Sequence, residues 1–159
     1  MNVIPPSASM GASVRTLSAE STRTFPEYAG TLAESVAAGF GCTAEVSWMT
    51  QYPPTVNDRE QARFAHDTLT RLFGADRLFQ AEDPLMGSED LSFVLDEVPG
   101  AFYFLFATPE GIDPETAAMN HSPHVRFDDA VLADQAASLA ALAWEHNVRR
   151  ASALAGSQS

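Results

Sequence analysis

The stretch Ala101–Ala107, AFYFLFA, is a continuous apolar run that directly follows Pro99-Gly100. An apolar run without alternation is typical of a strand that is buried on both faces of a sheet. The segments on either side of it have the apolar spacing of helices. A buried strand between helices predicts an α/β layer structure whose sheet contains further strands.

Two helices and a short strand are predicted between residue 57 and this run. Asn57 or Asp58 is expected to cap a helix that ends at Gly74. Residues 77–80 are expected to form a short strand. Residues 90–98 predict a short helix, which the following proline and glycine stop.

The last helix is predicted to start at a cap formed by Asp128 or Asp129. Apolar residues at helical spacing predict its buried face. That face comprises Leu132, Ala136, Leu139, Ala140 and Ala143. The small and polar residues 151–159 are expected to form a flexible tail.

The N-terminal third predicts a strand, a helix and a second strand. Residues 9–17 and 44–52 alternate as strands do. Ser18 is expected to start the helix, in which Pro26 suits a first turn or a restart. The apolar face of this helix recurs every four residues, at Tyr28, Leu32, Val36 and Phe40. Two prolines in Tyr52-Pro53-Pro54-Thr55 then predict an extended linker between two parts of the chain.

The net charge is −12, from 21 acidic and 9 basic residues. This balance argues against a nucleic-acid partner, because phosphate contacts need clustered Lys and Arg, and against an anionic membrane surface for the same reason. Cys42 is the only cysteine, so no intrachain disulfide can form. We expect a reducing, cytoplasmic location, since neither a signal peptide nor a membrane-spanning stretch is visible.

His121 is a candidate metal ligand. It lies in Asn120-His121-Ser122-Pro123, between the predicted buried strand and the last helix. Loops of this kind hold ligands in α/β proteins, and imidazole is the commonest metal ligand. His124 could chelate the same ion, but Pro123 argues against helical geometry, and no further ligands nearby complete a zinc set.

Two further groups are candidate binding residues. Arg15, with Asn2, is suited to a substrate carboxylate, because a guanidinium donates two parallel hydrogen bonds. The alternative for a single arginine on a half-exposed strand is a solvated side chain. In Gly87, Ser88 and Glu89, the glycine permits close backbone approach and the serine is expected to cap the next helix. A capped helix start explains most of this loop, and an acid–base pair is the alternative.

Six motifs in order and in register resemble one family over residues 2 to about 148. They are Asn2-Val3-Ile4-Pro5, Val14-Arg15-Thr16, Tyr52-Pro53-Pro54-Thr55-Val56-Asn57, Met86-Gly87-Ser88-Glu89-Asp90, Val98-Pro99-Gly100-Ala101-Phe102, and His121-Ser122-Pro123 with Phe127-Asp128-Asp129. Together they resemble the metallopeptidase-type amidohydrolases, which include hippurate hydrolases, aminoacylases and plant auxin-conjugate hydrolases.

The resemblance implies an incomplete two-domain fold. Residues 1–52 would form the second half of an α+β lid domain that often dimerises. Residues 53–150 would form the C-terminal part of an α/β catalytic domain that holds two metal ions, and residues 151–159 the tail. The implied reaction is the hydrolysis of N-acyl amino acids such as hippurate-like amides, with zinc, manganese or cobalt as the metal and a glutamate as general base.

The resemblance also assigns roles to single residues. His121 matches the family's C-terminal metal-binding histidine. Asn2 and Arg15 match lid residues on the carboxylate side of the substrate, and residues 87–89 match a segment that lines the active site. The other metal ligands and the Glu-Glu pair that includes the base have no counterpart here, so no catalytic residue is predicted in this chain.

Three hypotheses follow. The first is a part of an amidohydrolase, inactive alone and completed by a longer parent or a complementing N-terminal chain. Under this hypothesis the position of Met1 directly before the Asn2 motif indicates a truncated, split or wrongly started reading frame. The second is a stand-alone dimerisation or binding module without catalysis. The third is a small metalloenzyme that uses His121 and His124.

Overall fold

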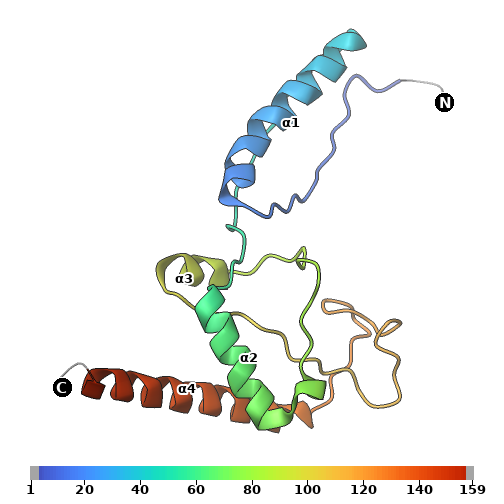
Figure 1. Ribbon diagram of the computed structural model, residues 1–159. Coiled ribbons are helices and arrows are strands. Elements are labelled where there is room, and N and C mark those ends of the chain that lie inside the picture. The colour runs from blue at the N-terminus through green and yellow to red at the C-terminus, as the bar shows by residue number, and fades with distance from the viewer. Residues whose placement is uncertain (1–3, 157–159) are drawn as a thin grey trace. The chain divides into compact units, whose positions relative to one another are not determined.

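The computed structural model describes residues 4–156 (Figure 1). The elements are α1 (Ala19–Gly39), α2 (Arg59–Phe73), the 3-10 helix η1 (Ala75–Arg77), α3 (Leu91–Glu97) and α4 (Val131–Gly156). They belong to two compact units. The first unit comprises residues 4–56 and 81–98, with α1 and α3, and the second comprises residues 57–80 and 99–156, with α2, η1 and α4. The division into domains at residues 52 and 53 stays a prediction.

α1 starts where the sequence predicts. The Ser18 hydroxyl accepts a hydrogen bond from the backbone N–H of Ser21 at 3.0 Å, which satisfies one free donor of the first turn. The helix continues through Pro26, so this proline is neither a first turn nor a restart, and one backbone hydrogen bond is lost there. The predicted apolar face is exposed, at 71% for Tyr28, 66% for Leu32, 53% for Val36 and 83% for Phe40.

α2 and α3 also lie where the sequence predicts them. Asp58, rather than Asn57, caps α2, because its carboxylate accepts the N–H of Gln61 at 2.9 Å. Gly74 ends α2 with a φ of 91°, a conformation that only glycine adopts at little cost. In the first unit, the ring of Phe93 on α3 meets that of Tyr52 edge-on.

α2 packs against α4 in the second unit (Figure 1). Phe64 and Leu69 are the buried apolar side chains of the described residues, and both lie on α2. The guanidinium of Arg149 lies over the Phe64 ring, 4.4 Å from its centroid. Farther along α2, Arg71 pairs with Glu145 at 3.6 Å. The earlier residue on α2 thus contacts the later residue on α4, and the later one contacts the earlier, so the two helices run in opposite directions.

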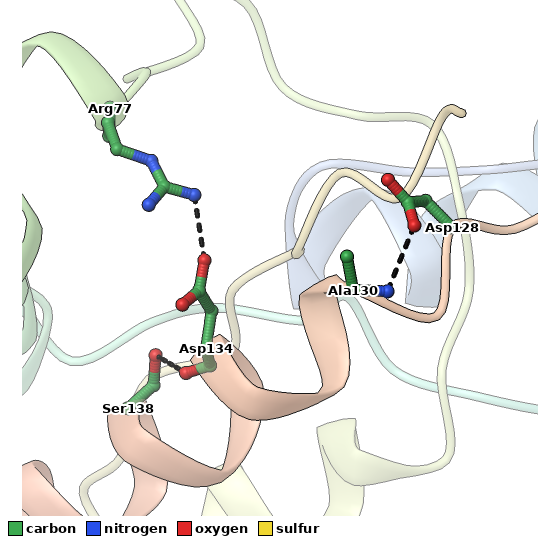
Figure 2. Close-up of polar contacts among 5 residues, drawn as sticks. All are labelled: Arg77, Asp128, Ala130, Asp134 and Ser138. Carbon is green, nitrogen blue, oxygen red and sulfur yellow. Dashed lines mark hydrogen bonds and ion pairs between the residues drawn. The ribbon is translucent and has the colours of Figure 1, made fainter. Parts of the chain in front are cut away.

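A hydrogen-bonded ion pair connects the first turn of α4 to η1. Arg77 donates a hydrogen bond from Nη2 to Oδ2 of Asp134 at 2.8 Å (Figure 2). The hydroxyl of Ser138 donates to the backbone carbonyl of Asp134 at 2.7 Å, so this buried polar group is satisfied within the helix. Just before the helix, Oδ1 of Asp128 accepts the N–H of Ala130 at 2.9 Å. Of the two aspartates predicted to cap this helix, Asp128 is the one whose carboxylate accepts a backbone hydrogen bond just before α4.

The apolar face predicted for α4 is wrong. Ser138 is 3% exposed, whereas Leu132 and Leu139 are 58% and 57% exposed. At about 100° per residue, Asp134 and Glu145 project from the same side of the helix as Ser138, and the predicted face lies on the opposite side. The ion pairs with Arg71 and Arg77 therefore accompany the burial of a polar side rather than the apolar one.

The four segments predicted as strands contain no strand within residues 4–156. They are residues 9–17, 44–52, 77–80 and 101–107. A strand needs a neighbouring strand whose N–H and C=O groups complete the ladder. The described chain is therefore helical and irregular, and the predicted α/β class finds no support in these residues.

Residues 101–107 show where the backbone hydrogen bonds go instead. The side-chain amide of Asn57 donates to the carbonyl of Phe102 at 2.9 Å and accepts its N–H at 2.7 Å. The N–H of Asp128 donates to the carbonyl of Ala107 at 2.8 Å. The segment is not buried, since Phe106 is 72% exposed. An asparagine side chain thus takes the place of a neighbouring strand at one residue.

α4 extends through residues 151–156, which the composition predicts as part of a flexible tail. These residues are helical and exposed, and their flexibility stays a prediction. Of the helices in the described part of the chain, none is both long and apolar enough to cross a membrane.

Candidate functional site

His121 lies in a hydrogen-bonded turn. The N–H of Ser122 donates to the carbonyl of Met119 at 3.1 Å, which places His121 in the third position of a four-residue turn. A second turn follows directly, because the N–H of Val125 donates to the carbonyl of Ser122 at 3.2 Å. Pro123 takes the second position of that turn, where its fixed φ fits. Pro123 therefore suits the turn that follows, and His121 lies exposed in the turn before it.

His121 has a φ of 71°, and no other non-glycine residue among residues 4–156 has a positive φ. The third position of such a turn is usually taken by glycine or asparagine. Residues with a Cβ pay about 1 kcal/mol or more for this conformation, and residues of this kind cluster at functional sites. The backbone angle therefore singles out His121 independently of its side chain.

A resident metal ion does not fit the described residues by themselves. Within residues 4–156, no three or more His, Cys, Asp and Glu side chains are grouped so that they could hold one. A zinc ion takes three or four protein ligands, and His121 would supply one. His124 follows in the second turn, with its backbone N–H bonded to Oγ of Ser122 at 3.2 Å. Two imidazoles would still leave the set incomplete.

Arg15 is exposed and bonds only to its immediate neighbours. Its Nη1 donates to Oγ of Ser13 at 2.6 Å and to the carbonyl of Val14 at 3.4 Å. None of the ion pairs among residues 4–156 includes it, so its charge has no carboxylate partner there. Asn2 lies outside the described residues. The binding role of both residues stays a prediction.

The loop of Gly87, Ser88 and Glu89 leads into α3 without the predicted serine cap. Asp90 takes the cap position and makes no side-chain cap bond. Instead Ser92, which is fully buried, donates from Oγ to the carbonyl of Glu89 at 2.7 Å. A Cβ added at Gly87 would have no atom within 4 Å, so close packing within this chain does not require the glycine.

The predicted site residues divide between the two units. Arg15 and residues 87–89 belong to the first unit, and His121 belongs to the second. The second unit also contains a cavity of about 150 Å³ that the sequence does not reveal. Its lining consists of Pro109, Ile112, Ala117, Ala118, His124 and Arg126.

Comparison with known proteins adds three similar hydrolases. The N-acetylcysteine deacetylase of Bacillus subtilis (strain 168) is 34% identical over 104 residues, which are 65% of this chain and 27% of that protein. The IAA-amino acid hydrolase ILR1-like 4 of Arabidopsis thaliana is 30% identical over 135 residues, 82% of this chain and 30% of that protein. The thermostable carboxypeptidase 1 of Saccharolobus solfataricus (strain ATCC 35092 / DSM 1617 / JCM 11322 / P2) is 29% identical over 132 residues, 82% and 32% respectively. The chain thus spans less than a third of the length of each of these relatives.

A family model also matches most of the chain. The model described as Peptidase family M20/M25/M40 matches residues 4–145. This range includes Arg15, the loop before α3 and the turn that holds His121. The family resemblance read from the six motifs is confirmed, and the chain belongs to Peptidase family M20/M25/M40.

Proposed function

We propose that this chain is part of a divalent-metal amidohydrolase that acts on N-acyl amino acids and that it is inactive alone. One observation carries the proposal: the family match extends over residues 4–145, through the turn in which His121 has its unusual backbone angle. The names of two relatives, a deacetylase of N-acetylcysteine and an amino acid hydrolase, support N-acyl amino acids as the substrate class.

Within this proposal the chain supplies a few groups of a larger site. His121 would be one donor to zinc, manganese or cobalt, held by its turn. Arg15, with Asn2, would bind the carboxylate of the substrate through charge-assisted hydrogen bonds. Gly87, Ser88 and Glu89 would line the site. The other metal ligands and the general base would come from a longer parent protein or from a complementing N-terminal chain. That segment would correspond to the roughly two thirds of the relatives' length that this chain does not cover. We propose the cytoplasm as the location.

The experiment begins with the chain alone. We expect no hydrolysis of N-acetylcysteine or hippurate with zinc, manganese or cobalt present. The DNA upstream of the Met1 codon is then read for an in-frame segment with further histidines, an aspartate or cysteine, and a Glu-Glu pair. The product that joins that segment to this chain should hydrolyse one of these substrates.

The decisive variant of the joined protein is His121→Ala. We expect its kcat/KM to fall by more than about 100-fold, because loss of a ligand exceeds the 10- to 100-fold effect of residues that merely orient one. His124→Ala is the matched control and should change kcat/KM little. Hydrolysis by the chain alone, or an active joined protein that tolerates His121→Ala, would contradict the proposal.

A second candidate is a stand-alone dimerisation or binding module. The exposed apolar face of α1 favours it, since Tyr28, Leu32, Val36 and Phe40 are each more than half exposed. Size-exclusion chromatography with light scattering separates the two candidates. A stable dimer that Leu32→Glu dissociates would support a dimerisation module, whereas a monodisperse monomer would exclude dimerisation as its role.

A further inference from the structure

We propose that residues 101–107 bind the same segment of a second copy of this chain as an antiparallel strand, with Phe104 at the twofold axis. The segment AFYFLFA is nearly a palindrome about Phe104, and only Tyr103 and Leu105 break the symmetry. Antiparallel pairing centred on Phe104 therefore places phenylalanine opposite phenylalanine, and alanine opposite alanine at both ends. A twofold interface requires a surface that matches itself in this way. The inference does not rest on the proposed hydrolysis.

The backbone of this segment has free hydrogen-bonding groups along one edge. In an extended chain, the N–H and C=O groups of successive residues point to opposite edges. On the edge of Phe102, the side chain of Asn57 bonds to both backbone groups. On the other edge, Tyr103 and Leu105 take part in no backbone hydrogen bond found among residues 4–156. Tyr103 of one copy can therefore exchange both backbone bonds with Leu105 of the other, and the twofold axis repeats the exchange.

The side chains of the segment divide between two faces, as those of a strand do. Tyr103 points towards α4, where its phenol forms a hydrogen bond with Ser138. Phe102 and Phe104 lie together, with ring centroids 4.9 Å apart, and residues two positions apart share a face of a strand. Phe104 and Phe106 are 53% and 72% exposed. Pairing joins the phenylalanines of both copies in one stripe, and such cross-strand aromatic pairs stabilise a sheet.

The segment lies in an uncharged part of an acidic chain. Two copies of a chain with net charge −12 repel each other, so they approach at least cost where charge is absent. Residues 98–109 contain no charged side chain, and Glu97 and Glu110 lie just outside this range. Salt screens these outer carboxylates and should therefore tighten the pair. An exposed apolar segment with unpaired backbone and no charge is a typical template for a strand of another copy.

The first test measures the oligomeric state of the 159-residue chain by sedimentation at several concentrations. We expect a dimer. Phe104→Glu places two carboxylates side by side at the twofold axis, so it should raise the dimer dissociation constant at least about tenfold. Phe79→Glu is the matched control, because Phe79 is 76% exposed in the same unit but outside the segment. It should leave the dissociation constant unchanged, and so should Leu32→Glu on α1.

A second test determines the register by cross-linking. Cys42→Ser removes the only native cysteine. In that background, Phe104→Cys should form a disulfide between copies under a mild oxidant, because facing residues of antiparallel strands lie within disulfide reach. Phe106→Cys is the matched control. Its counterpart in the other copy lies four residues along the strand, or about 13 Å away, so it should not cross-link.

Several outcomes would overturn the inference. A monodisperse monomer at the highest soluble concentration is one. A dimer that persists in Phe104→Glu with its circular dichroism unchanged is another, and dissociation by Leu32→Glu would assign the contact to α1 instead. Equal cross-linking of the two cysteine variants would show a different register. Hydrogen exchange of the unaltered chain decides the matter even if Phe104→Glu fails to fold, because the N–H groups of Tyr103 and Leu105 must gain protection as the concentration rises.

Discussion

The two units differ in what their helices pack against. In the second unit, α2 buries Phe64 and Leu69, and ion pairs from Arg71 and Arg77 reach α4. In the first unit, α1 has no buried residue, although its apolar face has the regular spacing of a packed helix. The apolar spacing and the cap predict the helix in both units, whether or not its apolar face is packed. A core forms only where a partner surface is within reach.

The largest expected effect compares one aromatic residue from each unit. Phe64→Ala should lower the free energy of unfolding by about 3 kcal/mol, because it removes a ring that is 8% exposed and lies under the Arg149 guanidinium. Tyr28→Ala, at a site that is 71% exposed, should change it by less than about 0.5 kcal/mol. Urea denaturation followed by far-UV circular dichroism measures both. A loss in Tyr28→Ala as large as that in Phe64→Ala would show that α1 is packed in solution, and the contrast between the units would disappear.

A smaller effect is expected where a side chain replaces a strand in the second unit. Asn57→Ala should cost about 1 to 2 kcal/mol, because it removes both hydrogen bonds to the backbone of Phe102. Asn147→Ala is the matched control, since its amide donates only to Ala143, one turn earlier in α4. Hydrogen exchange should show that the Phe102 N–H loses protection in Asn57→Ala and keeps it in the control. Retained protection in Asn57→Ala would mean that another group holds this segment.

The turn at His121 tests how firmly the loops of the second unit are held. His121→Gly relieves a positive φ and His124→Gly does not. Both substitutions add the same freedom to the unfolded chain, so the His121→Gly protein should be more stable than the His124→Gly protein by about 1 kcal/mol. Thermal unfolding of the two variants side by side gives the difference. Equal stabilities would indicate that the backbone at His121 relaxes in solution.

The smallest effect is a pH dependence in the second unit. Burial raises the pKa of Tyr103 above its usual value of 10.0, and a hydrogen bond with Ser138 partly offsets this. The folded state favours the neutral phenol of Tyr103. The stability that this preference contributes is fully present below the pKa of Tyr103 in the unfolded chain, and it is lost as the pH rises through the pKa of Tyr103 in the folded chain. Tyr103→Phe should therefore flatten the decline in stability above about pH 10. An unchanged decline would show that the phenol does not titrate in a buried setting.

Short-range features of the fold could be predicted from the sequence. The start of α1 at Ser18 and the end of α2 at Gly74 were predicted, and the cap of α2 was narrowed to Asn57 or Asp58. Each of these features depends on residues within a turn of one another. The family membership could also be predicted, since six motifs in register carry it. For the candidate site, the motif around His121 indicated the residue, and the neighbouring proline is consistent with the turn that holds it.

Features that depend on distant residues could not be predicted in this way. The predicted cap at Ser88 is wrong, because α3 starts later and Asp90 takes the cap position. The cavity beside His124 could not be predicted, because its lining comes from separate turns and no periodic sequence pattern is typical of such a lining. The positive φ of His121 likewise has no signature in composition, since positive φ is uncommon for any residue other than glycine.

The sequence by itself determined the four α-helices, the cap of α1 and the family. The helices and the cap depend on neighbours along the chain, and the family on short motifs in register. Only the tertiary structure decided which side of α4 is buried, and where the backbone bonds of AFYFLFA go. Those outcomes depend on pairs such as Arg77 with Asp134 and Asn57 with Phe102, which are 57 and 45 residues apart. An apolar run predicts that a segment is buried, and helical spacing predicts which face of a helix is apolar. The partner that each of them meets is set by the rest of the polypeptide.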